Sequence, residues 1–237
     1  MISDLLVGPN GDVWLAHGDD GISRWNGSGW EEFEPGSAPG FFDGRVDSIC
    51  LSPAGNVCLG IQGAGVSCFD GSQWTGIGFD GQLVGERVHG IAVDGMGEVY
   101  VITSDSDLED AFLYRFDGTA WIGWDIRGWK SLLAVGPDGT IWLAEAGAGL
   151  FNIRSGEWST DDLAEGLPIE EIRDIVFGPD GSMWVGTDNG AWRYDGTDWR
   201  SFLRRDVLLS DYVTEIAVSA ENTIWFGGIG LARYGAP

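Results

Sequence analysis

Six ionisable residues stand where short apolar runs begin, and their side chains could bind a ligand. They are Asp4, Asp47, His89, Arg173, Asp174 and Glu215. Carboxylate oxygens bind hard cations and attract basic groups, and a histidine beside carboxylates can exchange protons near neutral pH. Solvated strand ends would carry the same residue types, so the chemistry depends on whether the fold brings the runs together.

A second acidic group lies in the segment SDSDLEDAF. Asp105, Asp107, Glu109 and Asp110 have the alternate spacing that calcium loops use. The segment lacks the glycine and the distal glutamate of an EF-hand, so a solvated acidic loop is the alternative. The sequence indicates no cofactor, and calcium is the one ion that this loop would suit.

The residues that commonly perform catalysis are scarce. The chain has two histidines, His17 and His89, and no nucleophile elbow, phosphate loop or zinc motif. His89 is the best acid–base candidate, although a lone histidine at a strand end is commonly structural. The three cysteines (Cys50, Cys58 and Cys68) are odd in number and form no CxxC pair, so we expect buried free thiols. These residues favour binding over catalysis, and we predict no catalytic residue.

Four aromatic residues fall outside the regular pattern described next. Phe41 and Phe42 lie in a first long loop, and Trp124 and Trp129 in a third. Exposed rings can stack on sugars or anchor a protein partner. Packing of the loops onto the scaffold is the alternative.

The whole chain consists of successive copies of a unit of about 42 residues. Six copies align on one mostly aromatic position: Trp14, Cys58, Tyr100, Trp142, Trp184 and Trp225. Each copy opens with an apolar run, followed by a turn such as PDGT, an alternating run and a glycine-rich break. A third run, a second glycine turn and, in five copies, a run that opens with tryptophan complete the unit.

These units predict antiparallel strands and tight hairpins. Asp-Gly and Asn-Gly supply the positive φ that such turns need, and short alternating runs rich in Trp, Val and Ile are typical of strands. Four strands in about 42 residues form the blade of a β-propeller. We therefore predict one all-β, six-bladed propeller domain, with blades at approximately 1–44, 45–86, 87–128, 129–170, 171–211 and 212–237.

The repeat also assigns positions within the blades. The recurring tryptophans should fill the layers between blades, because a large ring at each repeat packs there. Arg24, Arg115, Arg193 and Arg233 share one third-strand position, and we expect them to pair with acids or carbonyls of the adjacent blade. The six ionisable residues named first should ring the mouth of the central channel, on the face with the variable loops.

The sixth blade differs from the others because no tryptophan-led run follows Tyr234. We therefore expect it to lack its outer strand. An unpaired strand edge invites strand addition, so self-association through this open edge is a candidate interaction.

The segment GPDGSMWVGTDNGAWRYDGTDW, Gly178 to Trp199, resembles the two-component regulator propeller repeat. The resemblance implies the sensor portion of a bacterial signalling protein, and a periplasmic or extracellular location. A looser resemblance to virginiamycin B (streptogramin) lyases implies a metal-assisted lyase as one alternative. That family's late-blade histidine has no match, because no histidine follows His89.

The net charge of the chain limits the classes of partner that it is suited to bind. The net charge is −24, with 13 basic and 37 acidic residues, which disfavours nucleic acid and anionic membranes. No apolar run is long enough to insert in a membrane, and this chain shows no signal peptide. We predict a non-catalytic recognition propeller that binds a small ligand or a protein on its acidic variable face, with a carbohydrate-binding, lectin-like propeller as the other alternative.

Overall fold

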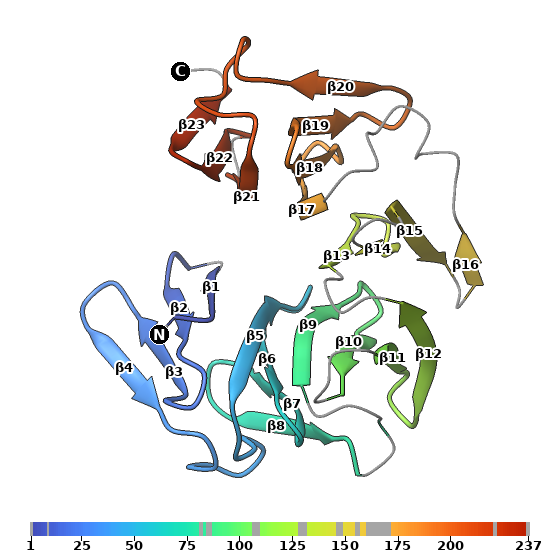
Figure 1. Ribbon diagram of the computed structural model, residues 1–237. Helices are drawn as coiled ribbons and strands as arrows, with labels where there is room; N and C mark the ends of the chain where they lie inside the picture. Colours follow the sequence, from blue (N-terminus) through green and yellow to red (C-terminus); the bar gives the residue numbers. More distant parts are fainter. Residues whose placement is uncertain are drawn as a thin grey trace. The chain divides into compact units, whose positions relative to one another are not determined.

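A computed structural model describes residues 2–8, 10–80, 83, 87–105, 110–127, 132–145, 149–154, 157–159, 172–219 and 222–235. The chain divides into two compact units, Met1–Trp129 and Lys130–Pro237. Throughout the described ranges the regular structure is β, in six small antiparallel sheets (Figure 1). The predicted fold class is confirmed: the chain is an all-β, six-bladed propeller, and its last blade has three strands.

The first unit contains three four-stranded blades whose strands are neighbours in chain order. Blade 1 comprises β1 (Asp4–Val7), β2 (Val13–Ala16), β3 (Ile22–Trp25) and β4 (Trp30–Phe33). Blade 2 comprises β5 (Val46–Leu51), β6 (Val57–Ile61), β7 (Gly65–Phe69) and β8 (Trp74–Gly78). Blade 3 comprises β9 (Arg87–Val93), β10 (Val99–Ser104), β11 (Asp110–Phe116) and β12 (Trp121–Arg127).

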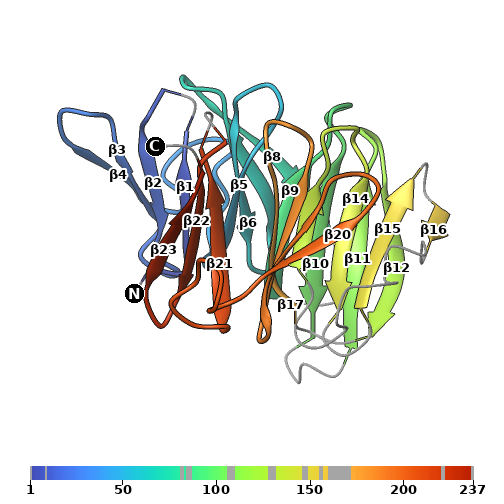
Figure 2. The same ribbon diagram turned by 90° about the horizontal axis from the view of Figure 1, so that it is seen from above.

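The second unit contains blades 4 to 6, built on the same plan. Blade 4 comprises β13 (Leu132–Val135), β14 (Ile141–Glu145), β15 (Gly149–Arg154) and β16 (Glu157–Ser159). Blade 5 comprises β17 (Ile172–Phe177), β18 (Met183–Thr187), β19 (Gly190–Tyr194) and β20 (Trp199–Phe202). Blade 6 comprises β21 (Val213–Val218), β22 (Ile224–Gly228) and β23 (Leu231–Tyr234), which lie side by side in Figure 2.

The hairpin between the third and fourth strands is closed by a repeated aspartate turn. The Asp195 carboxylate accepts hydrogen bonds from the backbone N–H groups of Thr197 and Asp198 and from the Thr197 hydroxyl. Gly196 between them has φ +101°, a conformation that L side chains rarely adopt. Asp70 and Asp117 make the same turns in blades 2 and 3. The Asp-Gly dipeptides of the sequence therefore fix the register of the outer strands.

Large aromatic rings fill the layers between neighbouring blades, as the repeat predicted. Trp14 of blade 1 is buried and contacts Phe69 of blade 2, with ring centroids 5.8 Å apart. Trp184 of blade 5 is buried in the same way and contacts Phe226 of blade 6 at 5.6 Å. Aromatic pairs at such distances add to the stability that burial supplies. These two tryptophans are therefore structural.

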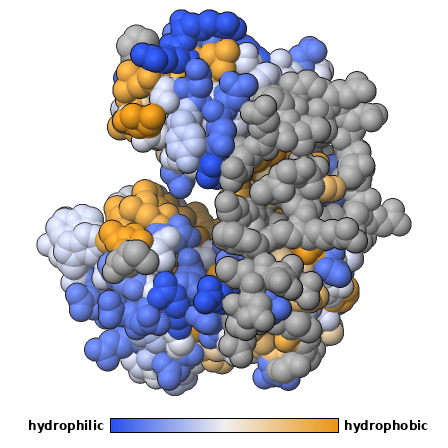
Figure 3. All heavy atoms as spheres, viewed as in Figure 1, coloured by the Kyte–Doolittle hydropathy of each residue, from blue (hydrophilic) through white to orange (hydrophobic). Residues whose placement is uncertain are grey.

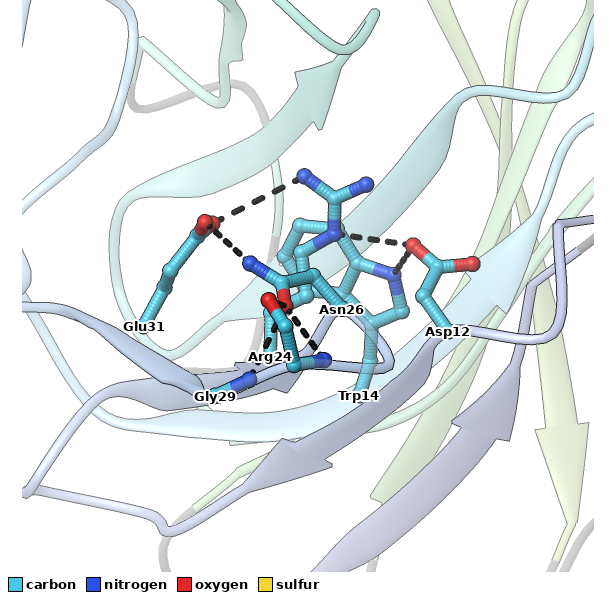
Figure 4. A network of polar contacts seen from close by, with 7 residues as sticks. Asp12, Trp14, Arg24, Asn26, Gly29 and Glu31 are labelled. Carbon is cyan, nitrogen blue, oxygen red and sulfur yellow. Dashed lines mark hydrogen bonds and ion pairs between the residues drawn. The ribbon is translucent and has the colours of Figure 1, made fainter.

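Arg24, Arg115 and Arg193 of the third strands pair with carboxylates of their own blade, which corrects the expectation of partners in the adjacent blade. In blade 1 the Asp12 carboxylate accepts hydrogen bonds from Trp14 Nε1 and Arg24 Nε, both at 2.9 Å (Figure 4). The Arg24 guanidinium lies 5.2 Å from the Trp14 ring and 3.7 Å from Glu31. Directly opposed positions on neighbouring strands bring the ring and the guanidinium together.

Blade 2 replaces this pair with a disulfide, so the expectation of three free thiols was wrong. Cys58 and Cys68 occupy the positions of Trp14 and Arg24 and are bonded to each other. They are directly opposed on β6 and β7, which is why residues distant from any CxxC spacing can pair. Cys50 is the free cysteine, and burial raises the pKa of its thiol to about 12.

Candidate functional site

A pocket of about 530 Å³ opens in the first unit, where blades 2 and 3 meet. The described residues that line it are Arg45, Asp47, Gln62, Arg87, Val88 and His89. Arg45 and Asp47 lie at the start of β5, Gln62 follows β6, and the other three residues open β9. Because these inner strands pack against each other, the same end of two blades contributes all six residues. The structure thus brings together two of the six predicted mouth residues, Asp47 and His89.

Arg45 is held in place by two carboxylates. Its Nε atom lies 2.6 Å from Asp47 Oδ1, and one terminal nitrogen lies 3.0 Å from Asp19 Oδ2. The same arginine also lines a neighbouring acidic pocket of about 510 Å³, together with Asp20, Glu34 and Asp43 among others. Its positive charge is therefore balanced by protein groups, and Arg45 serves mainly to orient Asp47.

Arg87 differs from Arg45, because its side chain is exposed on the pocket and the described part of the chain gives it no acidic partner. Among the described residues, no carboxylate lies within 4.0 Å of its guanidinium. An arginine presents five N–H donors in a planar fork that suits carboxylate and phosphate groups. In a chain with a net charge of −24, an exposed arginine that no described carboxylate neutralises is chemically suited to bind an anionic group.

His89 is neutral and anchored. Its Nε2 atom lies 2.6 Å from the Ser104 hydroxyl, which also donates a hydrogen bond to the Asp105 carbonyl at 3.2 Å. Burial lowers the pKa of His89 below its ordinary value; Asp47 opposes this shift and Arg87 adds to it. At neutral pH the ring is therefore an uncharged hydrogen-bonding group on the pocket wall.

Asp4 and Asp174 connect neighbouring blades instead of facing a ligand. Asp4 Oδ2 accepts a hydrogen bond from the Ile49 N–H at 2.9 Å, and Asp174 Oδ2 accepts one from the Ile216 N–H at 2.6 Å. In each case the donor lies within the inner strand of the next blade. Burial raises the pKa of both carboxyls, and for Asp174 to about 7, with a smaller contribution from Glu215.

The remaining predicted mouth residues, Arg173 and Glu215, lie in the second unit. Arg173 forms a two-point ion pair with Asp188, at 2.7 and 3.2 Å, and its guanidinium lies 5.0 Å from the Tyr212 ring. Glu215 is exposed on β21. Neither residue lines the pocket of the first unit.

Two of the four acidic residues that were predicted to form a calcium loop, Asp105 and Asp110, belong to the described part of the chain. Asp107 and Glu109 lie outside the described residues, and Asp110 begins β11. Asp105 is half-buried, and within the described ranges no three His, Cys, Asp or Glu side chains form a group that could hold a metal ion. The calcium hypothesis therefore stays a prediction.

Phe41 is buried and stacks on Trp74, with ring centroids 4.4 Å apart. Phe42 is half-buried beside it. Trp124 lies within β12, so the expectation that it belongs to a long loop was wrong. Trp129 falls outside the described residues. The two phenylalanines therefore pack the first long loop onto blade 2.

The sequence did not predict four of these pocket residues: Arg45, Gln62, Arg87 and Val88. A signal for two of them was present. Arg45 and Arg87 each stand two residues before a predicted mouth residue, at the same position of consecutive repeats. Alternate residues of a strand share a face, so each arginine had to lie beside its predicted neighbour.

Comparisons with known proteins agree with the fold. The sequence matches the Two component regulator propeller family over residues 166–189, and no curated protein matches the chain. Virginiamycin B lyase from Staphylococcus aureus is similar in structure, with a TM-score of 0.71 at 16% identity, covering 98% of this chain and 80% of that chain. The described part of the protein contains no helix of bilayer-spanning length.

Two longer bacterial proteins are similar over part of their length. PorZ, a surface component of the type-IX secretion system of Porphyromonas gingivalis, gives a TM-score of 0.69 at 14% identity, covering 99% of this chain and 38% of that chain. The extracellular domain of the BT4673 one component system of B. thetaiotaomicron gives 0.59 at 16% identity, covering 98% and 38%. This chain is thus a β-propeller that carries a two component regulator propeller repeat and resembles the extracellular domains of such signalling proteins.

Proposed function

We propose that this protein is a recognition propeller that binds a small, hydroxylated carboxylate in the pocket lined by Arg87 and His89. The observation that carries the proposal is the exposed Arg87 guanidinium, which no described carboxylate neutralises although the chain is strongly acidic. A volume of about 530 Å³ lies within the range of small-molecule sites, roughly 300–1,000 Å³.

The other lining groups would orient such a ligand. Arg87 would bind the ligand carboxylate, while the Gln62 amide and the neutral His89 ring offer hydrogen bonds to hydroxyl groups. Asp47, held by Arg45, adds a fixed acceptor. The carboxylate class follows from Arg87, because a guanidinium that no described carboxylate neutralises is best satisfied by a planar anion.

The setting we propose is the sensor portion of a signalling protein, outside the cytoplasm. Similarity to extracellular propellers supports this location. The Cys58–Cys68 disulfide supports it independently, because disulfides persist mainly in oxidising compartments. Fold similarity alone does not assign a ligand, so the pocket residues carry that part of the proposal.

The test is a thermal-shift screen of small carboxylates, their hydroxylated forms and matched neutral sugars. A ligand at 100 times its dissociation constant stabilises the fold by about 2.7 kcal/mol. We expect hydroxy acids to raise the melting temperature of the wild type but not of Arg87→Gln, while the control Arg205→Gln, at an exposed arginine of the second unit, responds like the wild type. Equal shifts in all three proteins, or a response to the neutral sugars alone, would refute the proposal.

A further inference from the structure

Three asparagines of the chain are each followed by glycine, at Asn10–Gly11, Asn26–Gly27 and Asn189–Gly190. At such a dipeptide the glycine nitrogen can attack the asparagine carboxamide, because glycine has no Cβ to hinder the approach. The attack needs a glycine N–H that is not already held in a hydrogen bond. All three asparagines are exposed, so sequence and exposure do not distinguish the three dipeptides.

The hydrogen bonds of the three glycines do distinguish them. The Gly11 N–H donates to the Gly8 carbonyl at 3.0 Å, and the Gly190 N–H donates to the Asp211 carbonyl. The Gly27 N–H has no acceptor among the described residues. Apart from its chain neighbours, no described heavy atom lies within 4 Å of the place that a Cβ of Gly27 would take. Of the three nitrogens, that of Gly27 is therefore the one free to react.

The turn between β3 and β4 also holds the Asn26 carboxamide over its own backbone. Asn26 Oδ1 accepts hydrogen bonds from the Ser28 hydroxyl at 2.7 Å and from the N–H groups of Ser28 and Gly29 at 3.0 and 3.1 Å (Figure 4). When the Gly27 nitrogen adds to Cγ, negative charge develops on this oxygen, and donors that already point at it stabilise that charge.

This hairpin is open to the water that the reaction consumes. Asn26, Gly27 and Ser28 are exposed. Figure 3 shows pale and blue atoms where Figure 1 places β3 and β4, so no apolar surface covers the turn in this view.

The same turn accommodates aspartate in other blades. Asp70, Asp117 and Asp195 occupy the position of Asn26 and accept the same backbone hydrogen bonds. A carboxylate at this position therefore fits the hairpin. It cannot donate to Glu31 Oε1, as Asn26 Nδ2 does at 2.7 Å, so the conversion removes one contact between β3 and β4 and adds one negative charge.

We propose that Asn26 is a site of spontaneous modification, at which the folded protein converts the carboxamide to a carboxylate. The Gly27 nitrogen forms a bond to Asn26 Cγ and gives its proton to solvent. The Cγ–Nδ2 bond breaks, and Nδ2 takes a proton from solvent and leaves as ammonia. Water then opens the cyclic imide at either carbonyl, which yields aspartate or isoaspartate. The net reaction consumes one water and releases one ammonia, and this site is independent of the ligand pocket.

The test is a time course of the intact protein in mildly alkaline ¹⁸O-enriched water, followed by proteolysis in ordinary water and peptide mapping by mass spectrometry. The heavy oxygen marks conversion that precedes proteolysis. We expect Asn26 to convert at least about tenfold faster than Asn10 and Asn189, a difference in barrier of about 1.4 kcal/mol. Both aspartate and isoaspartate should form at position 26, because the cyclic imide opens at two carbonyls.

The controls separate the effect of the fold from that of the dipeptide. In urea all three glycine nitrogens are equally free, so the three asparagines should convert at similar rates. Asn26→Asp provides the reference for the aspartate product in anion-exchange chromatography, and Asn26→Gln should not develop the acidic form. Conversion of Asn10 or Asn189 as fast as Asn26 in the folded protein overturns the proposal, as does aspartate without isoaspartate. An unchanged preference for Asn26 in urea would also overturn it, because the fold would then not be the cause.

Discussion

The pH dependence of the free energy of unfolding should reveal the titration of the buried Asp174 carboxyl. The perturbation is Asp174→Asn, which removes the charge and keeps one acceptor oxygen for the Ile216 or Ile175 N–H. In the wild type the pKa of Asp174 is raised from 3.8 to about 7, primarily by burial. The folded protein therefore holds a proton, between about pH 4 and 7, that the unfolded chain has released.

The sign and size of the effect follow from this shift. Because the folded pKa is raised, the stabilisation is fully present below about pH 4 and is lost as the pH rises through 7. Each pKa unit corresponds to about 1.4 kcal/mol, so about three units set an upper limit of about 4 kcal/mol. The free energy of unfolding of Asp174→Asn does not contain this pH-dependent loss, because the amide does not titrate. Its NH2 group leaves one backbone N–H without an acceptor, at a cost of about 1–3 kcal/mol at every pH.

The assay is urea unfolding followed by tryptophan fluorescence at intervals from pH 4.5 to 8.5. We expect the free energy of unfolding to fall with pH more steeply in the wild type than in Asp174→Asn. Asp20→Asn, at an exposed carboxylate, serves as the control and should follow the wild-type slope. Parallel pH profiles for the wild type and Asp174→Asn would refute the reasoning.

Three further predictions concern the core. Reduction of the Cys58–Cys68 disulfide should lower the free energy of unfolding by about 2–3 kcal/mol, because it closes a short loop; melts with and without dithiothreitol measure this, and unchanged melts would contradict it. In the native protein a thiol reagent should leave Cys50 unmodified, since burial raises its pKa to about 12, and should modify it once urea unfolds the chain. Trp14→Ala should cost about 3–5 kcal/mol in urea unfolding, whereas Trp30→Ala, at a side chain that is 54% exposed, should cost far less; similar losses would contradict the inter-blade role of Trp14.

The sequence predicted the fold because the repeat encodes it several times over. Asp-Gly turns such as Asp195–Gly196 fix the hairpins, and tryptophans such as Trp184 mark the layers between blades. The three-stranded sixth blade was predicted because five repeats have a fourth run that opens with tryptophan, whereas the sixth repeat has no such run after Tyr234.

The site was only partly predictable. Repeat alignment places Asp4, Asp174 and Glu215 at one strand position, and Asp47 and His89 at the position before it. Successive strand residues point to opposite faces, so Asp47 lines a pocket whereas Asp4 and Asp174 accept hydrogen bonds from backbone N–H groups of the next blade. The alignment does not supply what each position meets, and Glu215 at the same position as Asp4 is exposed. The Cys58–Cys68 pair was missed for a related reason, because cross-strand opposition is visible only once the register of β6 and β7 is known.

The most direct test of the central claim is hydrogen–deuterium exchange of the protein with the best hydroxy acid from the screen. A ligand that binds the pocket should slow amide exchange at its lining segments, residues 45–47, 62 and 87–89, and Arg87→Gln should abolish this protection. Protection confined to other segments, or protection that persists in Arg87→Gln, would contradict the assignment of ligand recognition to this pocket.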